Sequence, residues 1–226
     1  MASRKTVRGT KDKAINFEAS TLLTVLVGKE PNEKRFSVHE GFLCPRSEFF
    51  QRAMNGNWVE REERLIRLPE DDPEIFATYV NLVYTNVVAT SRKDPPEGRE
   101  AVAEEYETLS KLYVLSEKLC DIPTKNATLE AIFVLRSKLD AAGKKWSPTA
   151  EAAATIYAGS PAGCPGRRLM VDMFTCVDAQ YVEANAALLP RDFFVDLALV
   201  LARERGLKST SVAEYNGWLV YMEKLD

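Results

Sequence analysis

The stretch FSVHEGFLCPRSEFF, residues 36–50, is the part of the sequence that decides the fold. Residues 35–38 alternate polar and apolar side chains, which predicts a β-strand with one buried face. Residues 39–43 predict a compact helical segment that Pro45 stops, because proline cannot continue a helix. Residues 47–54 then carry an apolar stripe at helical spacing, so two short helices follow the strand directly.

The sequence around this stretch predicts a small sheet. Residues 22–27 are a β-prone run, and the polar loop 28–34 connects them to the strand at 35–38 as a hairpin. Residues 64–68 predict a third strand, and the pair Val87-Val88 predicts a brief further one.

Helices dominate the rest of the chain. Asp72 is suited to cap a helix that has Pro73 at its first position, and Ser147 with Pro148 repeats this arrangement. Residues 91–99 are a surface loop by composition. Apolar stripes predict further helices at about 104–119, 123–139, 148–159, 167–181, 190–205 and 212–224. Three strands mixed with helices and then helices alone predict an α+β domain with a helical appendage.

Charge and composition narrow the class of partner. The 226 residues are 46% hydrophobic and 28% charged, as in ordinary globular proteins, and the net charge is −3. We therefore do not expect nucleic acid as a partner. Residues 1–16 carry five basic side chains against Asp12. They predict a basic flexible tail over residues 1–18, and a nuclear-import or phosphate-contacting arm is the alternative.

The sequence also predicts where the protein is found. No apolar run reaches the roughly 18–20 residues that cross a membrane, and no secretory signal is present. Cys44, Cys120, Cys164 and Cys176 are scattered, which predicts buried thiols of an intracellular protein in the cytoplasm, the nucleus or both.

Catalytic chemistry is not predicted. His39 is the single histidine, and a nucleophilic mechanism needs a base within reach of its nucleophile. Cys44 is close in sequence, but we expect both residues to be packed in the core. One histidine and four dispersed cysteines do not form a zinc site by spacing. The sequence therefore predicts no enzyme, no metal, no cofactor and no small-molecule substrate.

An acidic run between residues 60 and 74 is interleaved with arginines. It predicts a solvated strand face. A rim that attracts a basic partner is the alternative.

Several segments in the right order resemble the BTB/POZ family, most closely its fungal members. They are residues 36–50, 65–69, 71–76, 84–85 and 112–118. The resemblance covers about residues 19–139. It implies the BTB/POZ fold, a short β-sheet capped by a helical cluster, followed by an all-helical extension over residues 140–226.

The resemblance implies a function in protein–protein interaction. Members self-associate, bind cullin scaffolds of ubiquitin ligases or recruit transcriptional regulators. For cullin binding the family uses a hydrophobic-x-Glu motif just after its second helix, and Trp58, Val59 and Glu60 occupy that position here. We predict these three residues as the partner contact. The alternative is that Trp58 packs onto the edge of the core.

Two positions depart from the family pattern. Dimeric transcription-factor members pair a buried Asp with an Arg, whereas the matching positions here are Thr24 and Glu40. Corepressor docking is therefore not carried over, and homodimerisation stays open. The sequence predicts an adaptor or scaffold, with a substrate adaptor of a cullin-type ubiquitin ligase as its most concrete form. The alternative is a nuclear transcription-regulatory scaffold without ligase function.

Overall fold

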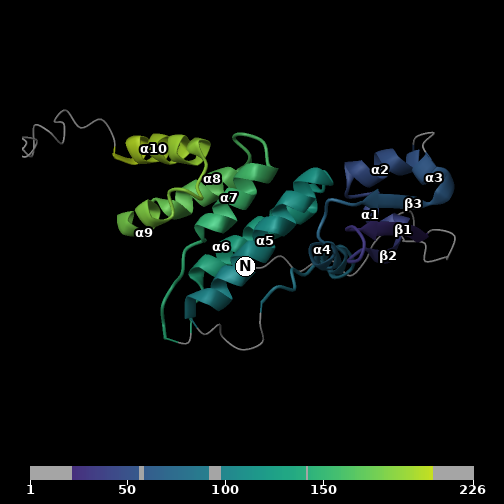
Figure 1. Cartoon of the computed structure of the whole chain (residues 1–226), viewed down its shortest axis with the longest axis horizontal. Coiled ribbons are helices and arrows are strands. Elements are labelled where there is room, and N and C mark those ends of the chain that lie inside the picture. The colour runs from purple at the N-terminus through teal and green to yellow at the C-terminus, as the bar shows by residue number, and fades with distance from the viewer. Residues whose placement is uncertain (1–21, 56–58, 92–97, 141, 206–226) are drawn as a thin grey trace, which may run out of the picture.

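The computed structural model describes residues 22–55, 59–91, 98–140 and 142–205. In Figure 1 the sheet and the first helices form one end of the molecule and the last helices form the other. The elements are β1 (Leu22–Val27), β2 (Lys34–His39), α1 (Glu40–Leu43), α2 (Glu48–Asn55), α3 (Val59–Glu63), β3 (Leu65–Leu68), α4 (Pro73–Thr85), α5 (Gly98–Lys118), α6 (Ile122–Ser137), α7 (Ala150–Gly159), α8 (Pro165–Phe174), α9 (Ala179–Ala184) and α10 (Arg191–Arg205).

The sheet has the strand order β2-β1-β3. Strands β1 and β2 pair antiparallel, with Leu23 opposite Val38, and this confirms the predicted hairpin. Strand β3 pairs parallel to β1, with Ile66 beside Val25, at the predicted position. Alternate side chains of β1 are fully buried, because a strand that has one covered face turns every second residue inward.

A first hydrophobic core, called the sheet core here, lies between this sheet and helices α1, α2, α4 and the end of α5. Phe50, Phe76 and Tyr79 are fully buried in it, and each contributes about 1.5–3 kcal/mol of burial free energy. Phe49 and Tyr84 are only half-buried.

A second core, called the helical core here, is built by helices α5 to α8 and α10. Small residues allow these helices to approach closely. Ala152 and Ala153 of α7 are fully buried. A Cβ atom on Gly159 would overlap the side chain of Val114 on α5, and one on Gly166 would overlap the ring of Tyr113.

Helix α5 belongs to both cores. Its earlier residues, such as Tyr106 and Leu109, pack in the helical core, whereas Leu112 and Leu115 pack in the sheet core. In Figure 1 the long helix lies in the middle of the molecule and runs toward the sheet. The predicted division between residues 139 and 140 stays a prediction.

A buried carboxylate ties the two regions together at the start of α6. Asp121 is fully buried and caps α6 by accepting a hydrogen bond from Thr124 N at 2.7 Å. Its other oxygen accepts from Arg46 Nε at 2.8 Å and from the Tyr79 hydroxyl at 3.0 Å. These three hydrogen bonds and the charge of the guanidinium compensate for the loss of water around the carboxylate.

Three predictions for the middle of the chain differ from the structure. Val87 and Val88 form no strand in the part of the chain that the structure describes, because the left-handed C-cap of α4 at Asn86 directly precedes them. Helix α5 begins at Gly98, earlier than predicted. Helix α7 begins at Ala150 because Thr149, and not Ser147, accepts the capping hydrogen bond from Ala152 N at 3.1 Å.

The helix predicted over residues 167–181 is two helices. Helix α8 ends at Phe174, and Asp178 starts α9 by accepting a hydrogen bond from Gln180 N at 2.7 Å. An aspartate competes well for free backbone N–H groups, so it starts a new helix more readily than it continues one. The predicted tail at residues 1–18 and the predicted helix at 212–224 lie outside the described residues.

Candidate partner-binding groove

A groove of about 470 Å³ opens between α2, α3, β3 and the end of α5. Its apolar walls are formed by Phe49, Ala53, Val59 and Leu65. Charged side chains and the thiol of Cys120 line the rest. Such a concave surface, apolar with a few polar groups at its edge, can hold a side chain of another protein.

The amphipathic pattern of α2 places two of these walls. Phe50 and Met54 point into the sheet core, so the neighbouring Phe49 and Ala53 are left half-buried beside the groove. Ser47 holds the start of α2 on the end of α5. Its hydroxyl donates to the Leu119 carbonyl at 2.6 Å and accepts from Phe50 N at 3.3 Å. The groove therefore has a rigid floor.

Helix α3 forms the outer rim. It has five residues and none of them is buried. The predicted contact residues Val59 and Glu60 both line the groove, and Val59 is 61% exposed. Trp58 lies outside the described residues, so both interpretations of this residue stay open.

The acidic run was predicted to be a solvated strand face, and this prediction was wrong. Glu60, Glu62 and Glu63 lie on helix α3, and Asp72 caps α4 by accepting a hydrogen bond from Glu74 N at 2.8 Å. The error arose because alternating charged residues do not distinguish a short helix from a strand.

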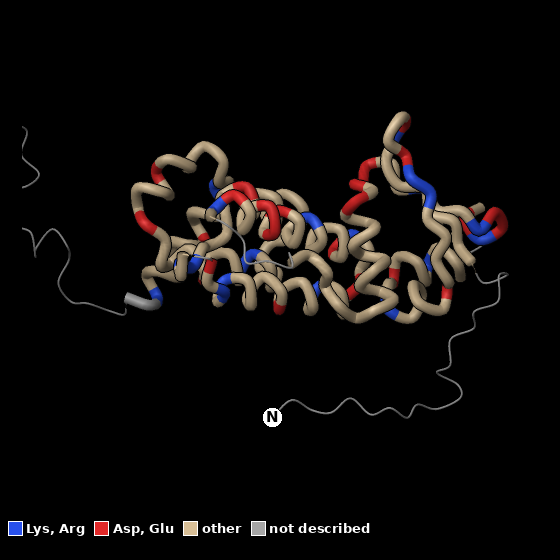
Figure 2. The backbone as a smooth tube through the Cα atoms, turned by 90° about the horizontal axis from the view of Figure 1, so that it is seen from below, with Lys and Arg blue, Asp and Glu red and all other residues tan. Residues whose placement is uncertain are grey.

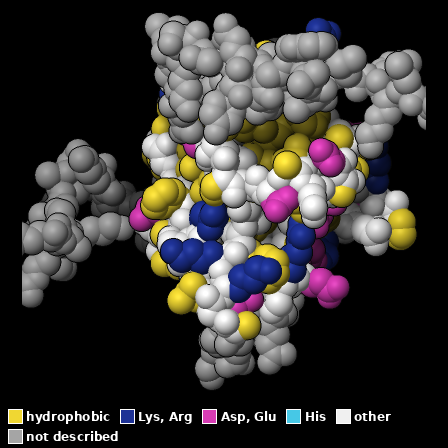
Figure 3. Space-filling model, turned by 90° about the vertical axis from the view of Figure 1, so that its left-hand side faces the viewer, with side chains coloured by type: hydrophobic (Ala, Val, Ile, Leu, Met, Phe, Trp, Pro, Cys, Tyr) yellow, Lys and Arg dark blue, Asp and Glu magenta, His cyan; other side chains and the backbone are white. Residues whose placement is uncertain are grey.

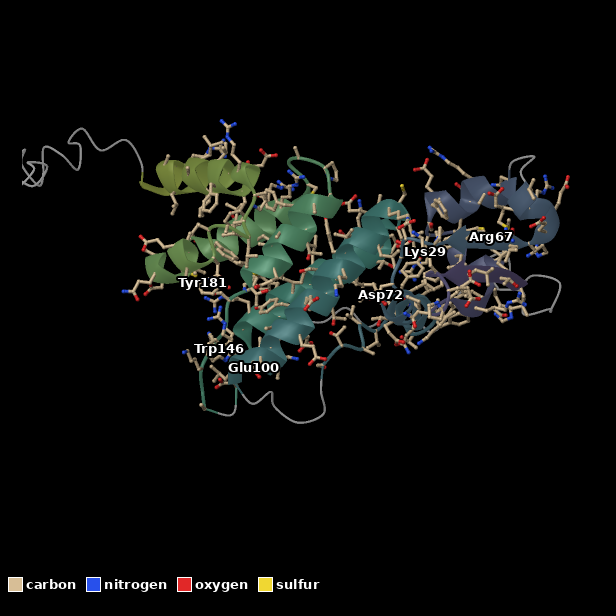
Figure 4. All side chains as sticks on the ribbon, viewed as in Figure 1. Lys29, Arg67, Asp72, Glu100, Trp146 and Tyr181 are labelled. Carbon is tan, nitrogen blue, oxygen red and sulfur yellow. The ribbon has the colours of Figure 1, made fainter. Side chains whose placement is uncertain are left out.

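The charges around the groove differ in how far they are neutralised. Arg52 pairs with Glu48 at 2.5 Å, and Arg67 pairs with Glu63 at 3.7 Å. Arg67 is labelled at the sheet end in Figure 4. Glu60 has no ion-pair partner among the described residues. It is therefore a carboxylate of the rim that can meet a cation of a partner.

Glu40 carries a second carboxylate, on α1, and this one is neutralised within the chain. It accepts from Arg64 Nη2 at 2.9 Å, and Arg64 Nε donates to the Leu22 carbonyl at 3.0 Å. Thr24 meets the same residue through its backbone, with its N–H donating to the Arg64 carbonyl at 2.9 Å. Sequence reasoning missed Arg64, because its left-handed backbone conformation, which turns it toward α1, has no signature in the sequence.

The histidine and the nearest cysteine have structural surroundings. His39 Nδ1 and the Tyr84 hydroxyl form a hydrogen bond of 2.8 Å, as expected of a histidine bonded within the fold. Burial, assisted by the nearby Glu40 charge, raises the pKa of the Cys44 thiol to about 11. A protonated thiol is a poor nucleophile. In the described ranges, no three His, Cys, Asp or Glu side chains cluster as metal ligands would.

The prediction that all four cysteines are buried was wrong. Cys164 is buried and Cys44 is half-buried, but Cys120 and Cys176 are exposed, and all four are free thiols. Cys120 lies two residues after the end of α5, has a left-handed backbone conformation and lines the groove. Sequence does not reveal this, because exposure depends on how the chain packs around the residue.

Two surface properties bear on the class of partner. None of the helices within the described ranges has the length and apolar character that crossing a bilayer requires. Both signs of charge are spread along the molecule in Figure 2, rather than separated into a basic and an acidic half.

Comparison with known proteins agrees with this architecture. Residues 18–122 match the BTB/POZ domain family, from just before β1 to the first residue of α6. No curated protein matches the chain. BTB domains are interaction modules and are generally not enzymes. The chain thus carries a BTB/POZ domain at residues 18–122, a protein–protein interaction module of α+β fold that is followed by a helical extension.

Proposed function

We propose that this protein is an adaptor or scaffold that binds a cullin scaffold of a ubiquitin ligase through the groove between α2 and α3. The observation that carries the proposal is the exposed pair Val59 and Glu60 at the rim of an apolar groove on the BTB/POZ domain. Trp58 precedes them and completes the hydrophobic-x-Glu motif.

The groove offers two complementary contributions to binding. An apolar side chain of the partner would bury Phe49, Ala53 and Val59, and removing apolar surface from water is the main driving force of association. Glu60 would meet a Lys or Arg of the partner, which favours the correct orientation. We therefore expect a partner surface with an apolar side chain beside a basic one.

The proposal is tested with purified cullin in a titration by calorimetry. The double variant Val59→Ala/Glu60→Ala should bind at least about tenfold more weakly than the wild type, as for residues at the centre of an interface. Trp58→Ala should weaken binding further.

Glu62→Ala is the matched control. Glu62 is an exposed carboxylate on the same helix, but it does not line the groove. It should bind like the wild type. Equal cullin binding by the wild type and the double variant, or no cullin binding by the wild type, contradicts the proposal. Light scattering of this protein alone reports whether it is a dimer.

A further inference from the structure

A second groove, of about 520 Å³, lies in the helical region between the end of α6 and α8. Its apolar walls are Phe133, Leu169 and Met173. Arg136, Lys145 and Asp172 are the charged residues that line it. None of these six residues belongs to the groove on the BTB/POZ domain.

One wall of this groove is a large apolar side chain that the helical core leaves exposed. Phe133 is 63% exposed, although α6 contributes other side chains such as Ile132 to the helical core. Val134 and Leu139, close to it in the chain, are also largely exposed, although neither lines the groove. A large apolar side chain left exposed beside a groove is typical of an interaction surface.

The cations beside the groove are not neutralised within the described part of the chain. Arg136 has no ion-pair partner there, and its guanidinium instead contacts Cys176 Sγ at 3.4 Å. Lys145 likewise forms no ion pair among the described residues. In Figure 3, which views the molecule from its helical end, Lys and Arg side chains gather among hydrophobic ones.

The loop that carries Lys145 is held in place by Asp140. The carboxylate accepts hydrogen bonds from the backbone of Lys144 at 2.8 Å and Ala142 at 2.9 Å, and from Trp146 Nε1 at 2.7 Å. These bonds, the backbone one from Lys144 foremost, lower the pKa of Asp140. Asp140 is the one acidic residue of this loop, and its carboxylate is engaged in hydrogen bonds within the loop. The cations of the groove therefore remain available to a partner.

We propose that this second groove binds an acidic amphipathic peptide segment of a partner protein. An apolar side chain of the segment would enter between Phe133, Leu169 and Met173, and its acidic side chains would meet Arg136 and Lys145. Because Asp172 and the apolar walls line the same groove, a polyphosphate chain fits it less well than a peptide.

The second groove is separate in space from the groove on the BTB/POZ domain. In Figure 4, Arg67 of the first groove and Trp146, next to Lys145 of the second, lie at opposite ends of the molecule. The two sites can therefore be occupied at the same time. In an adaptor, the second groove would select the protein that is brought to the first partner.

Fluorescence anisotropy of a labelled synthetic peptide tests the proposal on the full chain. The peptide carries leucines at i, i+4 and i+7 with glutamates on both sides. A charge-reversed peptide has lysines in place of the glutamates. We expect the acidic peptide to bind and the charge-reversed peptide to bind at least about tenfold more weakly. Binding of the acidic peptide should also weaken as salt is added.

Phe133→Ser and Arg136→Glu should each weaken binding of the acidic peptide about tenfold. The matched controls are Val195→Ser and Arg191→Glu, which change exposed residues of α10 away from the groove. Circular dichroism verifies that all four variants fold.

Three results would overturn the assignment. They are equal binding of the two peptides, no effect of the groove variants, and tighter binding of a single-stranded oligonucleotide than of the acidic peptide. Self-association of the wild type that Arg136→Glu abolishes would also overturn it, because the groove would then belong to a second copy of the chain. None of these measurements involves cullin, so the outcome is independent of the first proposal.

Discussion

The sheet core and the helical core of this protein are closed by different means. The sheet core is sealed by large side chains, such as Phe50 and Phe76, and by the polar network around Asp121, whose members lie far apart in the chain. The helical core also buries large side chains, such as Tyr106 and Phe174, and in addition its small residues let α7 and α8 approach α5. The sheet core therefore depends on hydrogen-bond partners for its buried polar groups, whereas the helical core depends on glycines whose lack of a side chain permits the close approach.

Helix α5 makes the two cores one physical system. It has side chains in both, and the cap of α6 at Asp121 bonds directly to Arg46 and Tyr79 of the sheet region. We therefore expect the cores to lose their structure together. Substitutions in each core, and the reactivity of the thiols, test this coupling.

Replacing Asp121 with alanine should lower the free energy of unfolding by about 3–5 kcal/mol, since Arg46 would stay largely buried without its partner. Urea unfolding followed by circular dichroism measures this. The control is Glu48→Ala, which removes an exposed ion pair with Arg52 and should cost at most about 1 kcal/mol. Similar losses for both variants would show that the polar network does not close the sheet core.

Replacing Gly159 with alanine should cost about 1–3 kcal/mol, because the added methyl group would overlap Val114 and push α7 away from α5. The double variant Gly159→Ala/Val114→Ala should recover part of the loss, by at least about 0.5 kcal/mol relative to additivity. Denaturant titrations of the single and double variants give the coupling. Strict additivity would mean that the helical core does not depend on this close approach.

The reactivity of the four cysteine thiols probes the folded structure without any substitution. In the folded protein at about pH 8, iodoacetamide should alkylate Cys120 and Cys176 first, since they are exposed. Cys44 should resist, because its pKa is raised to about 11. The folded state then holds the proton that the unfolded state releases, so this residue lowers stability as the pH rises toward that value.

Single-cysteine variants extend the measurement. As urea is added, Cys44 of the sheet region and Cys164 of the helical core should become reactive at the same concentration, provided that α5 couples the cores. Peptide mass mapping identifies the alkylated residue. Separate transitions for the two thiols would show that the cores unfold independently.

Local sequence signals predicted well where one residue determines one local geometry. The hairpin, the third strand and the cap of α4 at Asp72 were found from alternation and from capping chemistry. Prediction failed where neighbouring residues compete for the same role. Ser147 and Thr149 are both good caps, and in the structure Thr149 accepts the capping hydrogen bond.

No sequence pattern indicated the candidate groove itself. The position of a motif pointed to Val59 and Glu60, whose role as a partner contact stays a prediction, but the groove beside them has walls that come from α2, β3 and the end of α5. The groove between α6 and α8 had no signal, since Phe133 looks like any other apolar residue of an amphipathic helix.

Local sequence patterns are sufficient for the order of elements and for the BTB/POZ character of the first half, because hydrophobic periodicity and capping act between residues that are close in the chain. Which side chains stay outside the cores follows from the packing of the folded chain. Whether Phe133 is covered, whether Cys120 is exposed and which cation neutralises Glu40 depend on segments that are distant in sequence. Burial and ion pairing are properties of the packed surface, and no local pattern encodes them.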